Sequence, residues 1–373
     1  VNFFSTLPFV KDSFYRYGGD EFIILLHDQP NEFVMKTASR IMERFKSPWS
    51  IPNKEIYCTV SIGISFYPES GYTVEDIIKK ADIAMYRAKM SGKDAVAVFD
   101  NKIDSEFISK TETETCLRNA IKGGCSEFML YFQPIINLKI DKVVGAEALI
   151  RWQSPKLGLV YPGSFIPIAE NTGLIHQLGE WALKEACKCC KEWQDSGLEK
   201  IDLSVNFSMR QFQDPDLPNL IKRILKETRL SPESLTIEIT ESFQSNDYEM
   251  LINTIEIIRS MGIRSAMDDF GVGYASLGNL KRIPIDIIKI DRSLLKALDT
   301  DLYYKIFLRS VIELAHNMGL KVCVEGVETQ VQKDYTTMLR SDLAQGYFIS
   351  EPLPFEEFVT FVNEYNNRKS FSL

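Results

Sequence analysis

Apolar runs of strand length recur after Cys125 with helix-like patterns between them, and this alternation constrains the fold more than any other feature of the chain. The runs are "FMLYFQPI", "VVGAEALIRW", "IDLSVNFS", "SLTIEITES", "IRSAMDDFG", "DIIKID", "KVCVEGVE" and "LAQGYFIS". Strands that alternate with helices over about 250 residues are typical of a (β/α) barrel. The sequence therefore predicts an α/β protein whose larger part, residues 125–373, is a TIM-like (β/α)8 barrel.

Polar residues lie within these runs or directly past their apolar parts, where the C-terminal mouth of a barrel is expected. They are Gln133, Glu147, Asn206, Glu238, Asp268, Asp269, Lys289, Glu325 and Gln345. Five of them are carboxylates, which repel one another at one mouth unless cations neutralise them. Oxygen ligands of this kind suit Mg²⁺, Mn²⁺ or Ca²⁺.

The adjacent pair Asp268 and Asp269 can ligate two ions about 3.5–4 Å apart, an arrangement used for in-line phosphoryl displacement. Lys289 and Glu325 then remain to orient and deprotonate an attacking water. A single acid at the end of a strand is usually a helix cap or a solvated loop residue. The joint pattern, with glycines directly after the acids in "MDDFGVGYASLGNL", favours a ligand site instead.

Residues 125–373 resemble the EAL phosphodiesterases that linearise cyclic di-GMP. The resemblance is carried by "QPI", "EALIR", "NFS", "EITE", "DDFGVGYASL", "IKID", "EGVET" and "QGY", which occur in this order. One departure is visible, because Glu351 stands where the family usually has a basic residue before a proline.

The resemblance implies a role for each matched residue. Two divalent metals, Mg²⁺ or Mn²⁺, would be held by Glu147, Asn206, Glu238, Asp268 and Asp269. Lys289 and Glu325 would manage the nucleophilic water. Substrate contacts would come from Gln133, Leu149, Arg151, Glu328 and Gln345. Glu241 would stabilise the loop after Asp269, whose placement couples homodimerisation to metal binding in this family.

The first hundred residues predict a separate small α/β unit. Its expected pieces are a strand "FIILLHD", a helix around "FVMKTASRIMERF", a strand pair "IYCTVSIGISFYP", a helix "TVEDIIKKADIAMYRAKMSG" and a strand "AVAVFD". The stretch "YRYGGDEFIILL" predicts a hairpin whose glycines let backbone approach a phosphate and whose acids can hold Mg²⁺, although such a hairpin is more often a plain turn.

Residues 15–99 resemble the GGDEF domain of diguanylate cyclases. The resemblance implies nucleotide and metal contacts, to GTP with Mg²⁺, from Gly18, Gly19, Asp20, Glu21, Lys89 and Lys93. The part before the hairpin departs from the family: Asn2 and Ser5 stand at aspartate and lysine positions, and a segment is expected to be missing near Leu7 and Pro8. Phe9 replaces the arginine that would pair with Asp12 in the inhibitory product site. The sequence therefore does not decide whether this domain has cyclase activity.

Composition and charge set further bounds. The formal net charge of −8 gives no basic field for DNA or RNA, so a nucleotide must be held by local cations or metal. No apolar run reaches the roughly 20 residues of a membrane span, and the seven cysteines form no paired framework. The chain is expected to be cytoplasmic, with any sensor or membrane anchor of a longer protein preceding it. "EACKCCKEW" predicts a buried helix face more strongly than a zinc site.

These observations predict a GGDEF domain over residues 1–100, incomplete at its N-terminal part, a linker helix over 101–124 and an EAL domain over 125–373. The leading hypothesis is metal-dependent hydrolysis of cyclic di-GMP to linear pGpG, with the first domain as a GTP-binding or regulatory module. Two alternatives are a non-catalytic cyclic di-GMP receptor and a bifunctional cyclase and phosphodiesterase.

Overall fold

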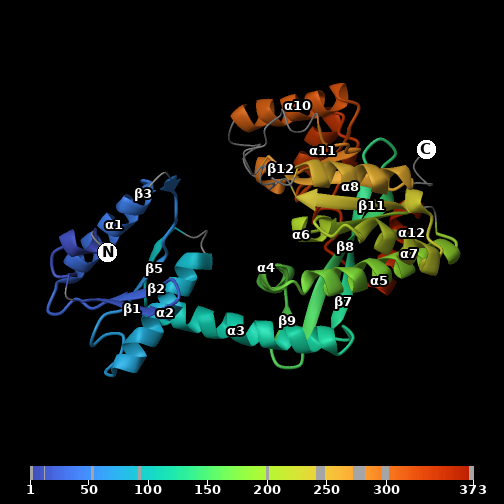
Figure 1. The fold of residues 1–373 in the computed structure, drawn as a ribbon. Coiled ribbons are helices and arrows are strands. Elements are labelled where there is room, and N and C mark those ends of the chain that lie inside the picture. Colours follow the sequence, from blue (N-terminus) through green and yellow to red (C-terminus); the bar gives the residue numbers. More distant parts are fainter. Residues whose placement is uncertain are drawn as a thin grey trace. The chain divides into compact units, whose positions relative to one another are not determined.

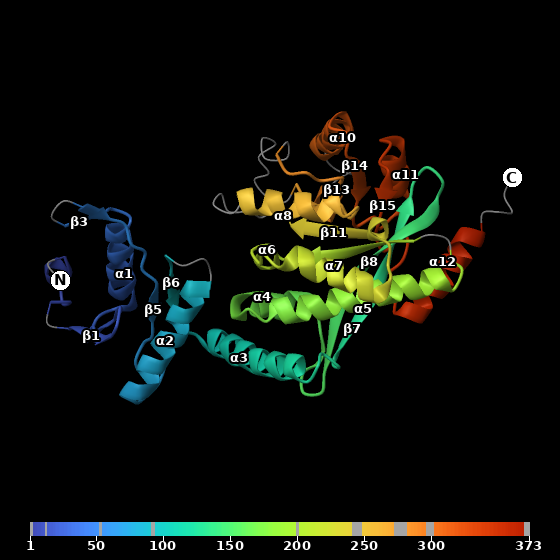
Figure 2. The same ribbon diagram turned by 45° about the vertical axis from the view of Figure 1, so that its right-hand side comes forward.

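The computed structural model describes residues 3–11, 13–51, 54–90, 94–198, 201–240, 248–271, 282–295 and 302–368. The chain divides into two compact units, Val1–Glu112 and Thr113–Leu373. Figures 1 and 2 show the elements of each unit from two directions. Within the described ranges, no helix combines the length and the apolar character needed to cross a bilayer.

The first unit consists of short strands and two longer helices. Its elements are η1 (Phe4–Thr6), β1 (Phe14–Gly18), β2 (Glu21–Ile24), α1 (Asn31–Phe45), β3 (Trp49–Ile51), β4 (Lys54–Ile56), β5 (Ile62–Ile64), α2 (Val74–Met90) and β6 (Val96–Val98). The pairs β1–β2 and β3–β4 are antiparallel, and β5–β6 is parallel with α2 as its crossover. The stretch "IYCTVSIGISFYP" was expected to be a strand pair, but β4 and β5 instead pair with β3 and β6 respectively.

Close contact between α2 and β5 depends on a glycine. A Cβ at Gly63 would lie 2.0 Å from the carbonyl oxygen of Ala81, so only a residue without a side chain lets the helix approach the strand this closely. A second small core forms where Leu7 and Val10 are buried against Ile41.

The second unit begins within α3 (Asn101–Lys122). The last turns of this helix bury Leu117, Ala120 and Ile121 in one cluster with Phe128 and Trp152 of the barrel unit. Gly124, at φ +82°, follows the helix and allows the sharp turn into the first barrel strand. The division of the chain therefore lies inside the predicted linker helix and not at its end.

The remaining elements of this unit alternate as the sequence predicts. They are β7 (Phe128–Asn137), β8 (Lys142–Ser154), β9 (Gly158–Val160), α4 (Pro162–Thr172), α5 (Ile175–Asp195), β10 (Asp202–Phe207), α6 (Met209–Phe212), α7 (Leu217–Thr228), η2 (Pro232–Ser234), β11 (Leu235–Thr240), α8 (Tyr248–Ser260), β12 (Arg264–Phe270), β13 (Ile287–Ile290), η3 (Arg292–Leu294), α10 (Leu302–Asn317), β14 (Lys321–Val324), α11 (Gln330–Met338), β15 (Leu343–Ala344) and α12 (Phe355–Asn367).

A closed barrel results from these strands. The order is β10-β11-β12-β13-β14-β15-β7-β8-β9, and a further pairing of β10 with β8 closes the ring, which confirms the predicted TIM-like barrel. Within the ring, β7 departs from the parallel pattern, because it is antiparallel to both of its neighbours; the short β9 also pairs antiparallel with β8. Residues 138–141 alone join β7 to β8, and a parallel crossover needs about a dozen residues or more.

Helix α5 covers part of the barrel with its cysteine-containing face. Cys187, Cys190 and Trp193 are fully buried in the main core. Burial raises the pKa of the Cys187 thiol to about 12, so the thiol stays protonated at neutral pH. The prediction of a buried helix face agrees with this packing.

Aspartates secure the N-terminal ends of two strands. Asp286 Oδ2 accepts a hydrogen bond from the Ser265 backbone N–H at 2.9 Å, and Asp342 Oδ2 accepts one from the Val322 N–H at 3.0 Å. His316 Nε2 lies 3.0 Å from the same Asp342 oxygen. These contacts hold the end of the barrel opposite the predicted mouth.

Candidate active site

The barrel strands bring the predicted polar residues to one place. Gln133 of β7 lies opposite Glu147 of β8, and Asn206 of β10 lies opposite Glu238 of β11. Glu325 directly follows β14, and Gln345 directly follows β15. In a closed barrel, inward positions of neighbouring strands meet at the axis, so residues far apart in sequence become neighbours.

Lys289 of β13 is the centre of this group. Its side chain is 2% exposed, and its Nζ lies 3.0 Å from Glu147 Oε2 and 2.6 Å from Glu238 Oε2. The same Nζ lies 2.7 Å from Glu325 Oε1 and 3.5 Å from Asp268 Oδ1. One buried ammonium group therefore contacts carboxylates from four other strands or strand ends.

Side-chain amides complete the surroundings of Glu147. Asn206 Nδ2 donates to its Oε1 at 2.6 Å, and Gln345 Nε2 donates to its Oε2 at 2.7 Å. Gln345 Nε2 also donates to Gln133 Oε1 at 2.9 Å, and Gln133 Nε2 donates to the Ser350 carbonyl at 3.2 Å. Both glutamines are therefore fixed by this network.

The carboxylates differ in how their surroundings affect proton binding. Burial alone would raise the pKa of Glu147, but Lys289 and the two amide donors hold it below the usual value. Burial raises the pKa of Glu325 to about 8 despite the attraction of Lys289. Burial also raises the pKa of Glu238 well above the usual range, and the neighbouring acids Glu147 and Asp268 add to this shift while Lys289 opposes it. Without a further cation, burial thus favours the protonated forms of Glu238 and Glu325.

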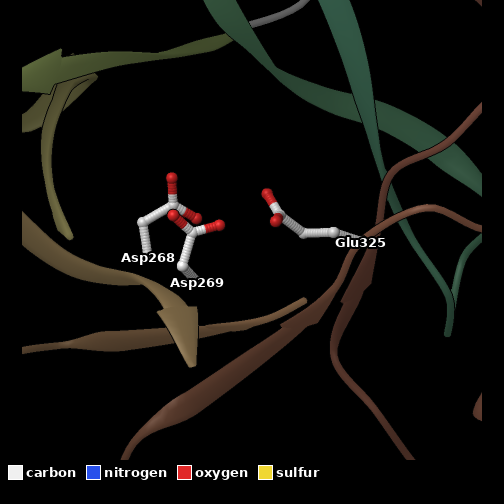
Figure 3. Close-up of side chains that lie close together, drawn as sticks. All are labelled: Asp268, Asp269 and Glu325. Carbon is white, nitrogen blue, oxygen red and sulfur yellow. The ribbon is translucent and has the colours of Figure 1, made fainter. Parts of the chain in front are cut away.

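Asp268, Asp269 and Glu325 form an acidic group that can bind a metal ion. One carboxylate oxygen from each lies within 4.8 Å of the others. Figure 3 shows the two aspartate side chains next to each other, with the Glu325 carboxyl group facing them. Asp268 Oδ1 is buried and accepts no hydrogen bond from the residues that the structure describes. The Lys289 ammonium lies 3.5 Å from this oxygen but is shared with three other carboxylates, so the donor set fits an additional hard divalent ion.

An irregularity in β12 explains how consecutive aspartates face one site. The pairing of β12 with β13 shifts register between Met267 and Phe270, and Asp269 has φ +57°. Successive residues of a regular strand point to opposite faces, whereas a bulge with a left-handed residue changes that alternation. Burial and the charge of Asp268 raise the pKa of Asp269, as expected for two acids this close.

The predicted substrate residues do not all join the carboxylate group. Leu149 and Arg151 follow Glu147 on β8 at spacings of two and four, so they share its face. The guanidinium of Arg151 lies near the faces of two rings, those of Tyr131 and Tyr161. Glu328 is exposed, and its backbone N–H donates to Gln332 Oε1 at 2.7 Å. Glu241 lies outside the described residues.

In the first unit, the Gly-Gly turn is open to solvent. Gly19 has φ +50°, and both Asp20 and Glu21 are exposed. Apart from their chain neighbours, no described residue comes within 4 Å of a Cβ at Gly18 or Gly19. Arg16 closes the turn by donating to the Gly19 carbonyl at 3.1 and 2.9 Å. Lys89 is exposed, and Lys93, Asn2 and Asp12 lie outside the described residues.

Several contributors were missed by the sequence prediction. The Ser350 carbonyl, the rings beside Arg151 and the closing role of Arg16 were not anticipated. Only Tyr131 carried a usable signal, because it precedes Gln133 by two residues in the same strand and therefore shares its face. The multiple partners of Lys289 depend on barrel closure and have no counterpart in local sequence.

Comparison with known families identifies both parts of the chain. Residues 115–352 match the family model "EAL domain", and residues 5–95 match "Diguanylate cyclase, GGDEF domain". The chain is 34% identical over 352 residues to the bifunctional diguanylate cyclase/cyclic di-GMP phosphodiesterase MucR of Pseudomonas aeruginosa. The matched region covers 94% of this chain and 51% of MucR. It is 32% identical to the cyclic di-GMP phosphodiesterase PdeR of Escherichia coli, and the matched region covers 95% of this chain and 53% of PdeR. The chain thus spans about half the length of these curated relatives.

A solved structure supports the assignment of the barrel. The phosphodiesterase part of P. aeruginosa MucR, solved in complex with c-di-GMP, is 36% identical and superposes with a TM-score of 0.63. The match covers 66% of this chain and 99% of that structure. The chain belongs to the EAL domain family and carries a GGDEF domain ahead of the EAL barrel.

Proposed function

We propose that the barrel hydrolyses cyclic di-GMP to linear pGpG. The observation that carries this proposal is the acidic group of Asp268, Asp269 and Glu325, in which the buried Asp268 Oδ1 accepts no hydrogen bond from the described part of the chain. The names of MucR and PdeR, as cyclic di-GMP phosphodiesterases, supply the substrate class. In the reaction, a water oxygen bonds to one phosphorus and the bond from that phosphorus to O3′ breaks, which leaves a 5′-phosphate and a 3′-hydroxyl.

Two divalent ions, Mg²⁺ or Mn²⁺, would be held by Glu147, Asn206, Glu238, Asp268 and Asp269. When bound, they supply Lewis acidity that activates water and neutralises phosphate charge. Their binding must displace the protons that burial favours on Glu238.

The chain's own groups would then act on the water and the substrate. Glu325 has a pKa of about 8 in the metal-free protein, so it would be ionised only once cations are bound, and it would then accept a proton from the attacking water. Lys289 holds Glu325 in place through the 2.7 Å contact and stabilises the negative charge that develops. Gln133 and Gln345 are oriented by their mutual hydrogen bond and position the substrate, together with Leu149, Arg151 and Glu328.

The assay is conversion of cyclic di-GMP to pGpG by the purified chain with Mg²⁺ or Mn²⁺. Glu147→Ala and Asp269→Asn are both expected to reduce turnover by a factor of at least about 100, the scale for loss of one essential electrostatic group. Asp269→Asn is the less disruptive change, since asparagine tolerates the left-handed φ of +57°. Glu356→Ala, an exposed acid at the start of α12, is the control. Absence of turnover with either metal, in folded and dimeric wild-type protein, would refute the proposal.

For the first unit, we propose a GTP-binding or regulatory role in which the Gly18–Glu21 turn, Lys89 and Lys93 contact nucleotide and Mg²⁺. Support comes from the open turn and its exposed acids. The bifunctional alternative is favoured by the similarity to MucR, which is described as bifunctional. Incubation of the Glu147→Ala variant with GTP separates these readings: cyclic di-GMP accumulates only if this unit is a cyclase.

We further propose that the protein acts as a homodimer in the bacterial cytoplasm, with Glu241 stabilising the loop after Asp269. The cysteines support the location, because the described structure contains them as free thiols, which persist in reducing compartments. Sedimentation of the purified chain with and without Mn²⁺ tests the dimer.

A further inference from the structure

Arg151 is held at the edge of the barrel by two aromatic rings from different elements. Its guanidinium carbon lies 5.4 Å from the centroid of the Tyr131 ring of β7 and 5.7 Å from that of Tyr161, the residue before α4. Both distances are within the range in which a cation is attracted to the face of a ring. Arg151 Nη1 also donates to the Ile150 carbonyl at 2.9 Å.

No carboxylate among the described residues forms an ion pair with this guanidinium. Acids elsewhere in the barrel are paired, such as Asp286 with Arg259 and Asp141 with Lys333. Arg151 therefore keeps a positive charge and unused N–H donors available to an anionic group. It shares the strand face of Glu147 and lies about 13 Å further toward the C-terminal end of β8, at about 3.3 Å per residue.

Tyr161 is poorly explained as a structural residue. Its side chain is 60% exposed, and although it occupies the N-cap position of α4 it makes no side-chain capping hydrogen bond. Pro162, which follows it, fixes the start of the helix without any help from the tyrosine ring. Among the described residues, the ring makes a cation–π contact with Arg151.

We infer that Tyr161 is a positioning residue for substrate binding: its ring, together with that of Tyr131, restrains the Arg151 guanidinium so that its free donors meet a phosphate of the substrate. This inference rests on the function proposed above. A long arginine side chain loses conformational freedom when it binds, and confinement in the free protein reduces that loss. Tyr161 acts through Arg151 and touches no reacting atom.

The test compares variants of Tyr161 that distinguish the effect of an aromatic ring from the effect of side-chain volume. Tyr161→Leu is expected to raise KM about two- to fivefold, the scale of one exposed cation–π contact, with kcat unchanged. Tyr161→Phe keeps the ring face and should retain the wild-type KM. Leu159 is an exposed residue of β9, two positions before Tyr161. Leu159→Ala is the control for local disturbance and should also leave KM unchanged.

A double-mutant cycle decides whether Tyr161 acts through Arg151. In an Arg151→Ala background, Tyr161→Leu should cause no further rise in KM. An equal rise in both backgrounds, or a wild-type KM for Tyr161→Leu, would overturn the inference. Equilibrium dialysis of cyclic di-GMP in EDTA gives the same comparison without turnover. Wild-type protein that neither hydrolyses nor binds cyclic di-GMP would refute the proposed function itself, whereas normal wild-type activity with unaffected variants refutes only the role of Tyr161.

Discussion

Replacement of Lys289 by methionine removes the positive charge from the centre of the barrel while keeping most of the side-chain volume. Three buried or nearly buried acids, Glu147, Glu238 and Glu325, then lose an ammonium that lies 3.0 Å or less from each. Removal of one partner from a buried ion pair costs about 3–5 kcal/mol, because the remaining charge is uncompensated. For a unit of this size, that corresponds to a fall in melting temperature of roughly 6–20 °C.

The loss of stability caused by Lys289→Met is expected to depend on pH in a defined direction. Without Lys289, the acids relieve their repulsion by binding protons, so the folded variant binds more protons than the unfolded chain above the ordinary glutamate pKa of 4.5. Stability therefore falls as pH rises through this window, and the difference from wild type should be larger at pH 8 than at pH 5.5. A divalent cation should restore more stability to the variant than to the wild type, because it replaces the missing charge.

Thermal unfolding in EDTA, followed by tryptophan fluorescence, measures this effect. Three of the four tryptophans, Trp152, Trp181 and Trp193, belong to the barrel unit, so the signal reports mainly on that unit. Lys184→Met, which removes an exposed pair with Glu227, is the control and should change stability by less than about 1 kcal/mol. If Lys289→Met unfolds at the wild-type temperature at pH 8, the assignment of Lys289 as the counter-charge is wrong.

Three further outcomes are expected. Because metal must displace a proton from Glu325, whose pKa is about 8, Mn²⁺ should raise the melting temperature more at pH 8 than at pH 6, and a pH-independent rise would contradict this. Asp342→Ala leaves the Val322 N–H without its acceptor and should lower the free energy of unfolding by about 1–3 kcal/mol in urea titrations; an unchanged midpoint would count against the bond. Gly63→Ala places a methyl group 2.0 Å from the Ala81 carbonyl, so amide exchange in β5 and α2 should increase, while unchanged protection would show that the contact can relax.

The barrel was predictable because its strands are covered on both faces. Strands of this kind read as continuous apolar runs with helical patterns between them, and the sequence shows them from "FMLYFQPI" to "LAQGYFIS". The direction of β7 was not predicted. It follows from the four-residue connection 138–141 to β8, which permits a hairpin and excludes a crossover helix.

The site was predicted as a set of residues but not as an arrangement. Glu147 and Glu238 were visible within apolar runs, and Glu325 was visible directly after one. Whether a given acid receives a metal, a proton or the Lys289 ammonium depends on distances across the closed barrel. The contacts of Tyr131 and Tyr161 with Arg151 were missed for the same reason, since the two rings come from segments 30 residues apart in sequence.

The sequence by itself determined the elements, the family motifs and the chemical types of the ligands. These are local properties: they depend on residue type, on the spacing of apolar residues and on turn residues such as Gly18 and Gly19. Only the tertiary structure decided which charges neutralise one another, because electrostatic energy depends on distance and burial and not on separation along the chain. Lys289 illustrates this, since Glu147, 142 residues earlier, becomes its buried partner only when β10 pairs with β8 and closes the barrel.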